Sequence, residues 1–158
     1  MIPEQCMSAR SNLLEIVRAA GVMASEIPRK QGWDLLQAWR EVYCAPVKAA
    51  TGRWVIGGAD GYSWHTFSYE YFHCLEGRRA LAEYAMQPAN EFLVLTERSH
   101  DMALRCYGPT LPDFSGLLRD VYVTPPMFDW TMVFTHEGED FGPYFSRVEW
   151  ASVRPSRN

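Results

Sequence analysis

The chain has 158 residues, of which 47% are hydrophobic, and this apolar content is sufficient for the core of one domain. No basic start precedes an apolar run, and no stretch approaches the roughly 20 apolar residues of a membrane span, so we expect a cytoplasmic protein without membrane contact. The net charge is −4, but residues 61–150 carry six Arg and thirteen Asp or Glu, a balance of −7, which disfavours nucleic-acid partners and favours basic ones.

The N-terminal part is predicted to be helical. Apolar residues recur at helical spacing over residues 8–25, and good helix formers dominate there in spite of Gly21. A second helix is expected from Trp33 to Tyr43, before Pro46. We expect one domain over residues 1–158, with a helical part over residues 1–50 and a sheet part over residues 60–150.

The sheet part shows the patterns of several short strands, interrupted by a helix over residues 75–86. The expected strands cover residues 91–96, 102–107, 121–124, 130–135 and 144–150, and residues 62–67 are a further candidate for a short strand. Their connections are mostly too short for parallel crossovers, which predicts an antiparallel meander of about four or five strands. With helices expected to cover one face of this sheet, the predicted fold class is α+β.

Five motifs in the sheet part carry a family resemblance. They are Trp64-His-x-Phe-Ser-Tyr69, Cys74-Leu-Glu-Gly77, Asp120-x-Tyr-Val123, Trp130-Thr-x-Val-x-Thr-His-Glu137 and Gly142-Pro-Tyr-Phe145. Their order and spacing resemble the bacterial domain-of-unknown-function family numbered 4275, over roughly residues 33–146. The resemblance implies a bacterial cytosolic protein, and the helix before Trp33 departs from the family pattern. Because the family has no established activity, it assigns no catalytic residue to this chain.

The residue types that bind metals do not occur at the spacing of a metal site. The histidines are His65, His73, His100 and His136, and no two have the i, i+4 helical spacing of a zinc-protease site. The cysteines are Cys6, Cys44, Cys74 and Cys106, and without a C-x-x-C pair they indicate reduced thiols. We therefore expect no metal and no cofactor.

Two roles are open for His136, which is predicted at the end of a strand beside Glu137. Neighbouring residues on a strand point to opposite faces, so convergence of these two side chains on one ion or substrate is not expected. A structural His136, bonded to a backbone carbonyl and a hydroxyl, would fix the loop that follows. Alternatively, the protein is a hydrolase-like enzyme in which His136 acts as general acid or base with a nearby carboxylate, in a pocket lined by Trp64 and Tyr144.

The stretch from residue 129 to residue 140 carries four carboxylates and no Lys or Arg. An acidic surface of this kind suits a basic cleft, such as those with which toxins bind nucleic acid. Small families of unknown function also often include immunity proteins encoded beside toxins, which is an analogy. We therefore expect a non-catalytic protein that binds another protein, in the manner of a toxin-neutralising immunity protein. The predicted contact residues are Asp129, His136, Glu137, Glu139 and Asp140; the oligomeric state is not predicted.

Overall fold

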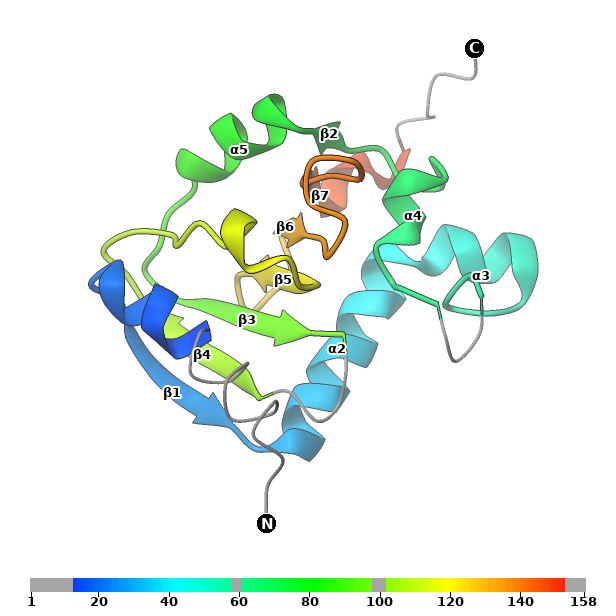
Figure 1. Ribbon diagram of the computed structural model, residues 1–158. Coiled ribbons are helices and arrows are strands. Elements are labelled where there is room, and N and C mark those ends of the chain that lie inside the picture. The colour runs from blue at the N-terminus through cyan, green and yellow to red at the C-terminus, as the bar shows by residue number, and fades with distance from the viewer. Residues whose placement is uncertain (1–12, 58–60, 98–101, 153–158) are drawn as a thin grey trace.

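The computed structural model describes residues 13–57, 61–97 and 102–152 (Figure 1). Its centre is one antiparallel sheet of seven strands in the order β1-β4-β3-β5-β6-β7-β2. The strands are β1 Met23–Ile27, β2 Leu75–Glu76, β3 Phe92–Thr96, β4 Ala103–Tyr107, β5 Val121–Thr124, β6 Trp130–Phe134 and β7 Tyr144–Arg147. The predicted α+β class is confirmed, with more strands than the four or five expected.

Helices surround this sheet. The α-helices are α2 Arg29–Tyr43, α3 Ala45–Thr51, α4 His65–Ser68 and α5 Arg78–Ala85, and the 3-10 helices are η2 Ser115–Leu117 and η3 Val148–Ser152. Residues 13–19 are helical as well. Among the described residues no helix is long and apolar enough to cross a lipid bilayer.

The sheet is buried on both faces, whereas the sequence predicted helices on one. Along β6, Trp130, Met132 and Phe134 pack into one hydrophobic cluster with Tyr84 of α5, and Val133 packs into a second with Trp39 of α2. Figure 1 shows α2 and α5 on opposite sides of the central strands. The continuous apolar run of β3, four buried residues in succession, is the sequence signature of a strand covered on both sides.

The N-terminal part contains a strand where a helix was predicted. Gly21 follows the end of the helix; it has a φ of 75° and donates its N–H to the Arg18 carbonyl at 2.9 Å, while the Val22 N–H donates to the Val17 carbonyl at 3.2 Å. These two bonds form a Schellman motif. Residues 23–27 then pair with β4 as an edge strand. Residues 8–12, at the start of the predicted helix, lie outside the described residues.

Two further elements differ from the sequence prediction. Residues 62–67, a candidate for a short strand, form a turn and most of α4, because the Tyr62 carbonyl already accepts a bond from the His65 N–H at 3.2 Å. The helix expected over residues 75–86 starts only at Arg78, since Leu75 and Glu76 pair with Phe145 and Tyr144 as β2. The strands expected over residues 91–96 and 102–107 are formed as β3 and β4, which pair with each other, but residues 98–101, including His100, lie outside the described part.

Candidate functional site

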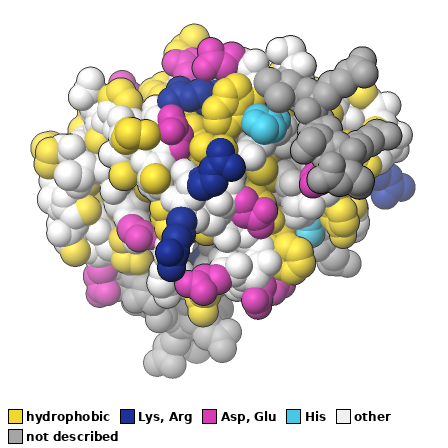
Figure 2. All heavy atoms as spheres, turned by 90° about the horizontal axis from the view of Figure 1, so that it is seen from above, with side chains coloured by type: hydrophobic (Ala, Val, Ile, Leu, Met, Phe, Trp, Pro, Cys, Tyr) yellow, Lys and Arg dark blue, Asp and Glu magenta, His cyan; other side chains and the backbone are white. Residues whose placement is uncertain are grey.

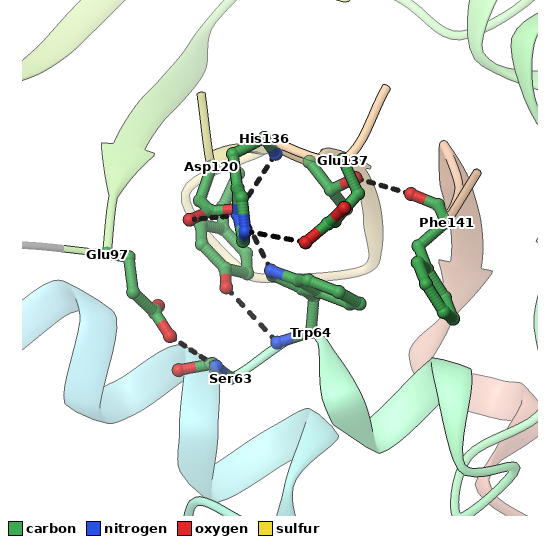
Figure 3. Close-up of polar contacts among 9 residues, drawn as sticks. Ser63, Trp64, Glu97, Asp120, His136, Glu137 and Phe141 are labelled. Carbon is green, nitrogen blue, oxygen red and sulfur yellow. Dashed lines mark hydrogen bonds and ion pairs between the residues drawn. The ribbon is translucent and has the colours of Figure 1, made fainter. Parts of the chain in front are cut away.

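The candidate site lies where β5 begins and β6 ends. These strands are antiparallel, with Val121 opposite Phe134, so Asp120 and His136 meet at the same end of the sheet. A third segment reaches this end from outside the sheet, because Trp64, at the start of α4, turns its indole toward Asp120 (Figure 3).

Asp120 holds the three segments together. Its Oδ1 accepts hydrogen bonds from Trp64 Nε1 at 2.9 Å, from the His136 backbone N–H at 3.1 Å and from His136 Nδ1 at 2.9 Å. The Asp120 side chain is only 11% exposed. A carboxylate with this many N–H donors is a strong acceptor, so it fixes both the indole and the imidazole in position.

His136 lies between two carboxylates. Its Nδ1 contacts Asp120, and its Nε2 lies 3.1 Å from Glu137 Oε1. The expectation that His136 and Glu137 point apart is wrong, because β6 ends at Phe134 and both residues belong to the turn that follows. In its imidazolium form, His136 donates to both carboxylates at once.

Aromatic rings surround the imidazole. Tyr62 lies 4.6 Å from the His136 ring, between centroids, and stacks on Trp64 at 5.8 Å with an 18° interplanar angle. His65 packs on Trp64 at 4.2 Å, and its Nδ1 lies 2.7 Å from Ser68 Oγ. Burial lowers the pKa of His65, against the opposing influence of Asp120. The uncharged form of His65 is therefore favoured beside His136.

A second polar layer supports the site from the core. The Ser63 N–H donates to the buried carboxyl group of Glu97, and the Trp64 N–H donates to the Tyr122 hydroxyl at 3.1 Å. Arg40 Nε donates to Ser63 Oγ at 2.8 Å. Burial raises the pKa of Glu97, although the Ser63 hydrogen bond and Arg40 oppose this rise. These contacts fix the backbone of residues 63–64, and therefore the direction of the Trp64 side chain.

The turn after β6 forms a short loop, residues 136–142, which we call the acidic loop (Figure 1, orange). The Thr135 hydroxyl donates to the Phe141 carbonyl and closes the loop. Inside it, the Gly138 N–H donates to Thr135 and the Asp140 N–H donates to Glu137, both at 3.3 Å. With the two bonds from His136 to Asp120, the loop is anchored at both ends.

The structure brings four of the five predicted contact residues together. His136, Glu137, Glu139 and Asp140 belong to the acidic loop, and the three carboxylates are exposed. Asp129 is exposed too, but it precedes β6, whereas the acidic loop follows it. The five residues of that strand separate the two places by about 16 Å. Asp129 therefore does not share the surface of the other four.

Sequence reasoning missed the residues that organise the site: Asp120, Tyr62 and His65. Sequence reasoning named Trp64 as a residue of the alternative enzyme's pocket; its side chain lies in the core, being 2% exposed, and its indole N–H donates to Asp120. The available signal was the set of motifs itself. Asp120-x-Tyr-Val123, Trp64-His65 and Thr135-His-Glu137, far apart in the sequence, all supply residues to this end of the sheet.

The site is rich in acid–base groups. In the described part of the chain, no three His, Cys, Asp or Glu side chains are placed to hold a metal ion. Asp120 contacts Nδ1 of His136, and in many enzymes a carboxylate at this nitrogen orients a histidine that acts as general acid or base through Nε2. Nε2 of His136, however, already faces Glu137, and the exposed loop around it is acidic.

Comparison with known proteins supports the motif resemblance. Neither the curated proteins nor the solved structures gave a match. A family model matches residues 12–145, so the helical residues 13–19 lie within the family pattern, and treating the helix before Trp33 as a departure from it was wrong. The matched region contains every residue of the site described above, and the chain belongs to the family described as Domain of unknown function (DUF4275).

Proposed function

We propose that the protein binds another protein, in the cytoplasm, through the acidic loop and the surface beside it. The observation that carries this proposal is the construction of the loop, which is exposed but anchored by the bonds from His136 to Asp120 and from Thr135 to Phe141. A loop held in one conformation by a rigid scaffold loses little conformational entropy when a partner binds.

The loop combines charge with an aromatic anchor. Glu137, Glu139 and Asp140 are exposed, and the Phe141 side chain beside them is 47% exposed. Aromatic side chains in the middle of an interface contribute much of its binding energy, and surrounding charges accelerate association with a partner of opposite sign. Figure 2 shows, on the face seen from above, acidic side chains among hydrophobic ones, with Lys and Arg side chains between them.

A basic protein domain fits this surface, and a secreted toxin that binds nucleic acid is one protein of that kind. Neutralisation of such a toxin, as by an immunity protein, is the specific role we propose. The cysteines support a reducing compartment, since Cys44, Cys74 and Cys106 are free thiols.

The test is a capture experiment with two charge-reversed variants. The native protein serves as bait in an extract of its source organism, beside a Glu139→Lys/Asp140→Lys variant and an Asp129→Lys variant. We expect a basic partner that the native protein and the Asp129 variant retain and the loop variant loses. Retention should also weaken as salt is added, because exposed charges are screened. The proposal fails if the loop variant retains every partner of the native protein.

A hydrolase-like activity is the second candidate, favoured by the 2.9 Å contact between Asp120 and His136 Nδ1. It requires Glu137 to leave Nε2 so that the imidazole can take a proton from a substrate or water. Assays with generic ester, phosphodiester and glycoside substrates test it. Turnover that is lost in a His136→Gln variant supports this candidate, whereas equal rates in both proteins exclude it for these substrates.

A further inference from the structure

A cavity of about 300 Å³ opens beside the acidic loop. Its wall comes from α4 and the residues after it, from β2, from the acidic loop and from the start of β7. We call it the aromatic pocket, after the rings of Phe67, Phe72, Phe141 and Tyr144 that line it. Two stretches far apart in the sequence, residues 67–76 and 140–144, build this cavity, so it is not a depression between neighbouring side chains of one loop.

The rings form a packed wall. Phe67 lies 5.8 Å from Tyr144 and 6.1 Å from Phe72, between ring centroids. Phe141 belongs to the acidic loop, and its ring lies 6.1 Å from that of Trp64, between centroids. This contact connects the pocket to the candidate site. Phe67, Phe72 and Tyr144 are each 2% exposed, so their positions are fixed by the core.

The polar lining is acidic. Glu70, Glu76 and Asp140 contribute carboxylates, and none of the described residues that line the pocket is Lys or Arg. Burial, together with Glu76 and Glu70, raises the pKa of the Cys74 thiol in the wall to about 12. The thiol is therefore neutral at physiological pH, and the net charge facing the cavity is negative.

We propose that the aromatic pocket receives an arginine side chain of the protein partner. A planar guanidinium stacks on an exposed aromatic face and donates paired hydrogen bonds to carboxylates. This cavity offers the half-exposed ring of Phe141 and the carboxylates named above. The inference rests on the proposed function, because the pocket shares Asp140 and Phe141 with the binding loop. It adds a chemical requirement: the partner presents an arginine next to the residues that contact the loop.

The direct test uses a small probe and the full-length protein. N-acetyl-arginine amide is titrated while the backbone amide signals of Cys74, Phe141 and Tyr144 are followed by NMR. The control ligand is N-acetyl-citrulline amide, which has nearly the same shape without the charge. For a ligand of this size we expect saturable shifts with a Kd on the order of 1 mM for the arginine probe, and none for citrulline.

The matched variants are Glu76→Gln/Asp140→Asn, which removes two carboxylates from the pocket, and Asp129→Asn, which removes one from the far end of β6. We expect the first to weaken arginine binding at least about tenfold and the second to leave it unchanged. Equal binding of arginine and citrulline, no saturable shift, or full affinity in the double variant would each overturn the inference.

The outcomes separate this inference from the proposed function. If the capture experiment recovers a partner that depends on the acidic loop but the arginine probe does not bind, the pocket assignment fails and the binding function stands. If the probe binds as expected but no partner depends on the loop, the pocket is a guanidinium site and the proposed function fails.

Discussion

Asp120 shows how one side chain connects the core to the candidate site. Its carboxylate joins β5, the start of α4 and the acidic loop, which are separated by 56 and 16 positions in the sequence. None of these hydrogen bonds is a backbone–backbone bond of a helix or sheet. The arrangement therefore depends on a single acceptor that is strong enough to satisfy several donors.

An Asp120→Asn variant should be less stable by about 2 kcal/mol. The amide has nearly the same shape, but it carries no charge and replaces one acceptor with an N–H donor group that faces His136 Nδ1. Urea unfolding measures the change. Asp129→Asn is the control, because Asp129 is exposed, and it should change the free energy of unfolding by less than about 0.5 kcal/mol. Equal effects of the two substitutions would contradict the anchoring role of Asp120.

Glu97 should make stability depend on pH. Burial raises its pKa above the ordinary value of 4.5, so the folded protein holds this proton more tightly than the unfolded chain does. Stability from this group is therefore present at low pH and is lost as pH rises through the folded pKa. Relative to the native protein, a Glu97→Gln variant should gain stability between about pH 4.5 and about pH 7.5. Urea unfolding at both pH values tests this; a constant difference would show that Glu97 does not titrate in this range.

At the scale of elements, α2 is joined to the sheet by a buried polar contact as well as by packing. Trp39 is fully buried, lies 4.7 Å from Tyr122 between ring centroids, and donates from Nε1 to Thr131 Oγ1 at 2.8 Å. Thr131 in turn donates to the Val123 carbonyl at 3.3 Å. The helix therefore has a defined position over β5 and β6, and through Arg40 it also supports Ser63 beneath the candidate site.

A Trp39→Phe substitution should lower the free energy of unfolding by about 2–3 kcal/mol. It removes ring volume from a closed core and also the indole N–H that donates to Thr131. Trp33 on the same helix is 42% exposed, and Trp33→Phe should cost less than about 1 kcal/mol. Chemical denaturation followed by far-UV circular dichroism compares the two. Similar costs would mean that α2 is not held through its buried face.

The elements that the sequence predicted well are those with one dominant signal. The alternation of Trp130, Met132 and Phe134 marks β6, and the two apolar runs on either side of a polar turn mark β3 and β4. The pattern failed for β1, because four of its five residues are exposed and one of them, Ala24, continues the helical spacing of Val17 and Ala20. Gly21 carried the correct signal, a helix end, and its positive φ is what that position requires.

The candidate site was only partly accessible from the sequence. The acidic loop was found because its carboxylates are close together in the sequence, and His136 was found because it adjoins Glu137. Asp120 is a single carboxylate before a strand, and its contact with His136 follows from the register that places Val121 opposite Phe134. Register is a property of strand pairing, so residue types and periodicity alone did not reveal this contact.

At the scale of the whole molecule, the sheet separates two hydrophobic cores. One includes Tyr84 and Phe114, and the other includes Trp39 and Trp64. The candidate site lies at one end of the sheet, next to the second core, so its supporting layer of Ser63, Glu97 and Tyr122 is continuous with buried packing. The site is therefore expected to stay intact only while both cores are formed.

Neighbouring substitutions on β6 test this architecture. Met132 and Val133 are both fully buried, but they belong to different cores. Met132→Ala should cost about 2–5 kcal/mol, and Val133→Ala about 1–3 kcal/mol, because each leaves a cavity in a packed core. If only one face of the sheet were covered, one of the two would change stability by less than about 0.5 kcal/mol.

The same variants test whether the two cores unfold together. We expect one transition in urea, coincident by tryptophan fluorescence and by far-UV circular dichroism, in the native protein and in both variants, since β6 is shared by the cores. An exposed position in β1, such as Met23→Ala, is the control and should leave the midpoint nearly unchanged, because Met23 is 74% exposed. Separate transitions for the two probes would show that each core is stable without the other, and that the site depends on only one of them.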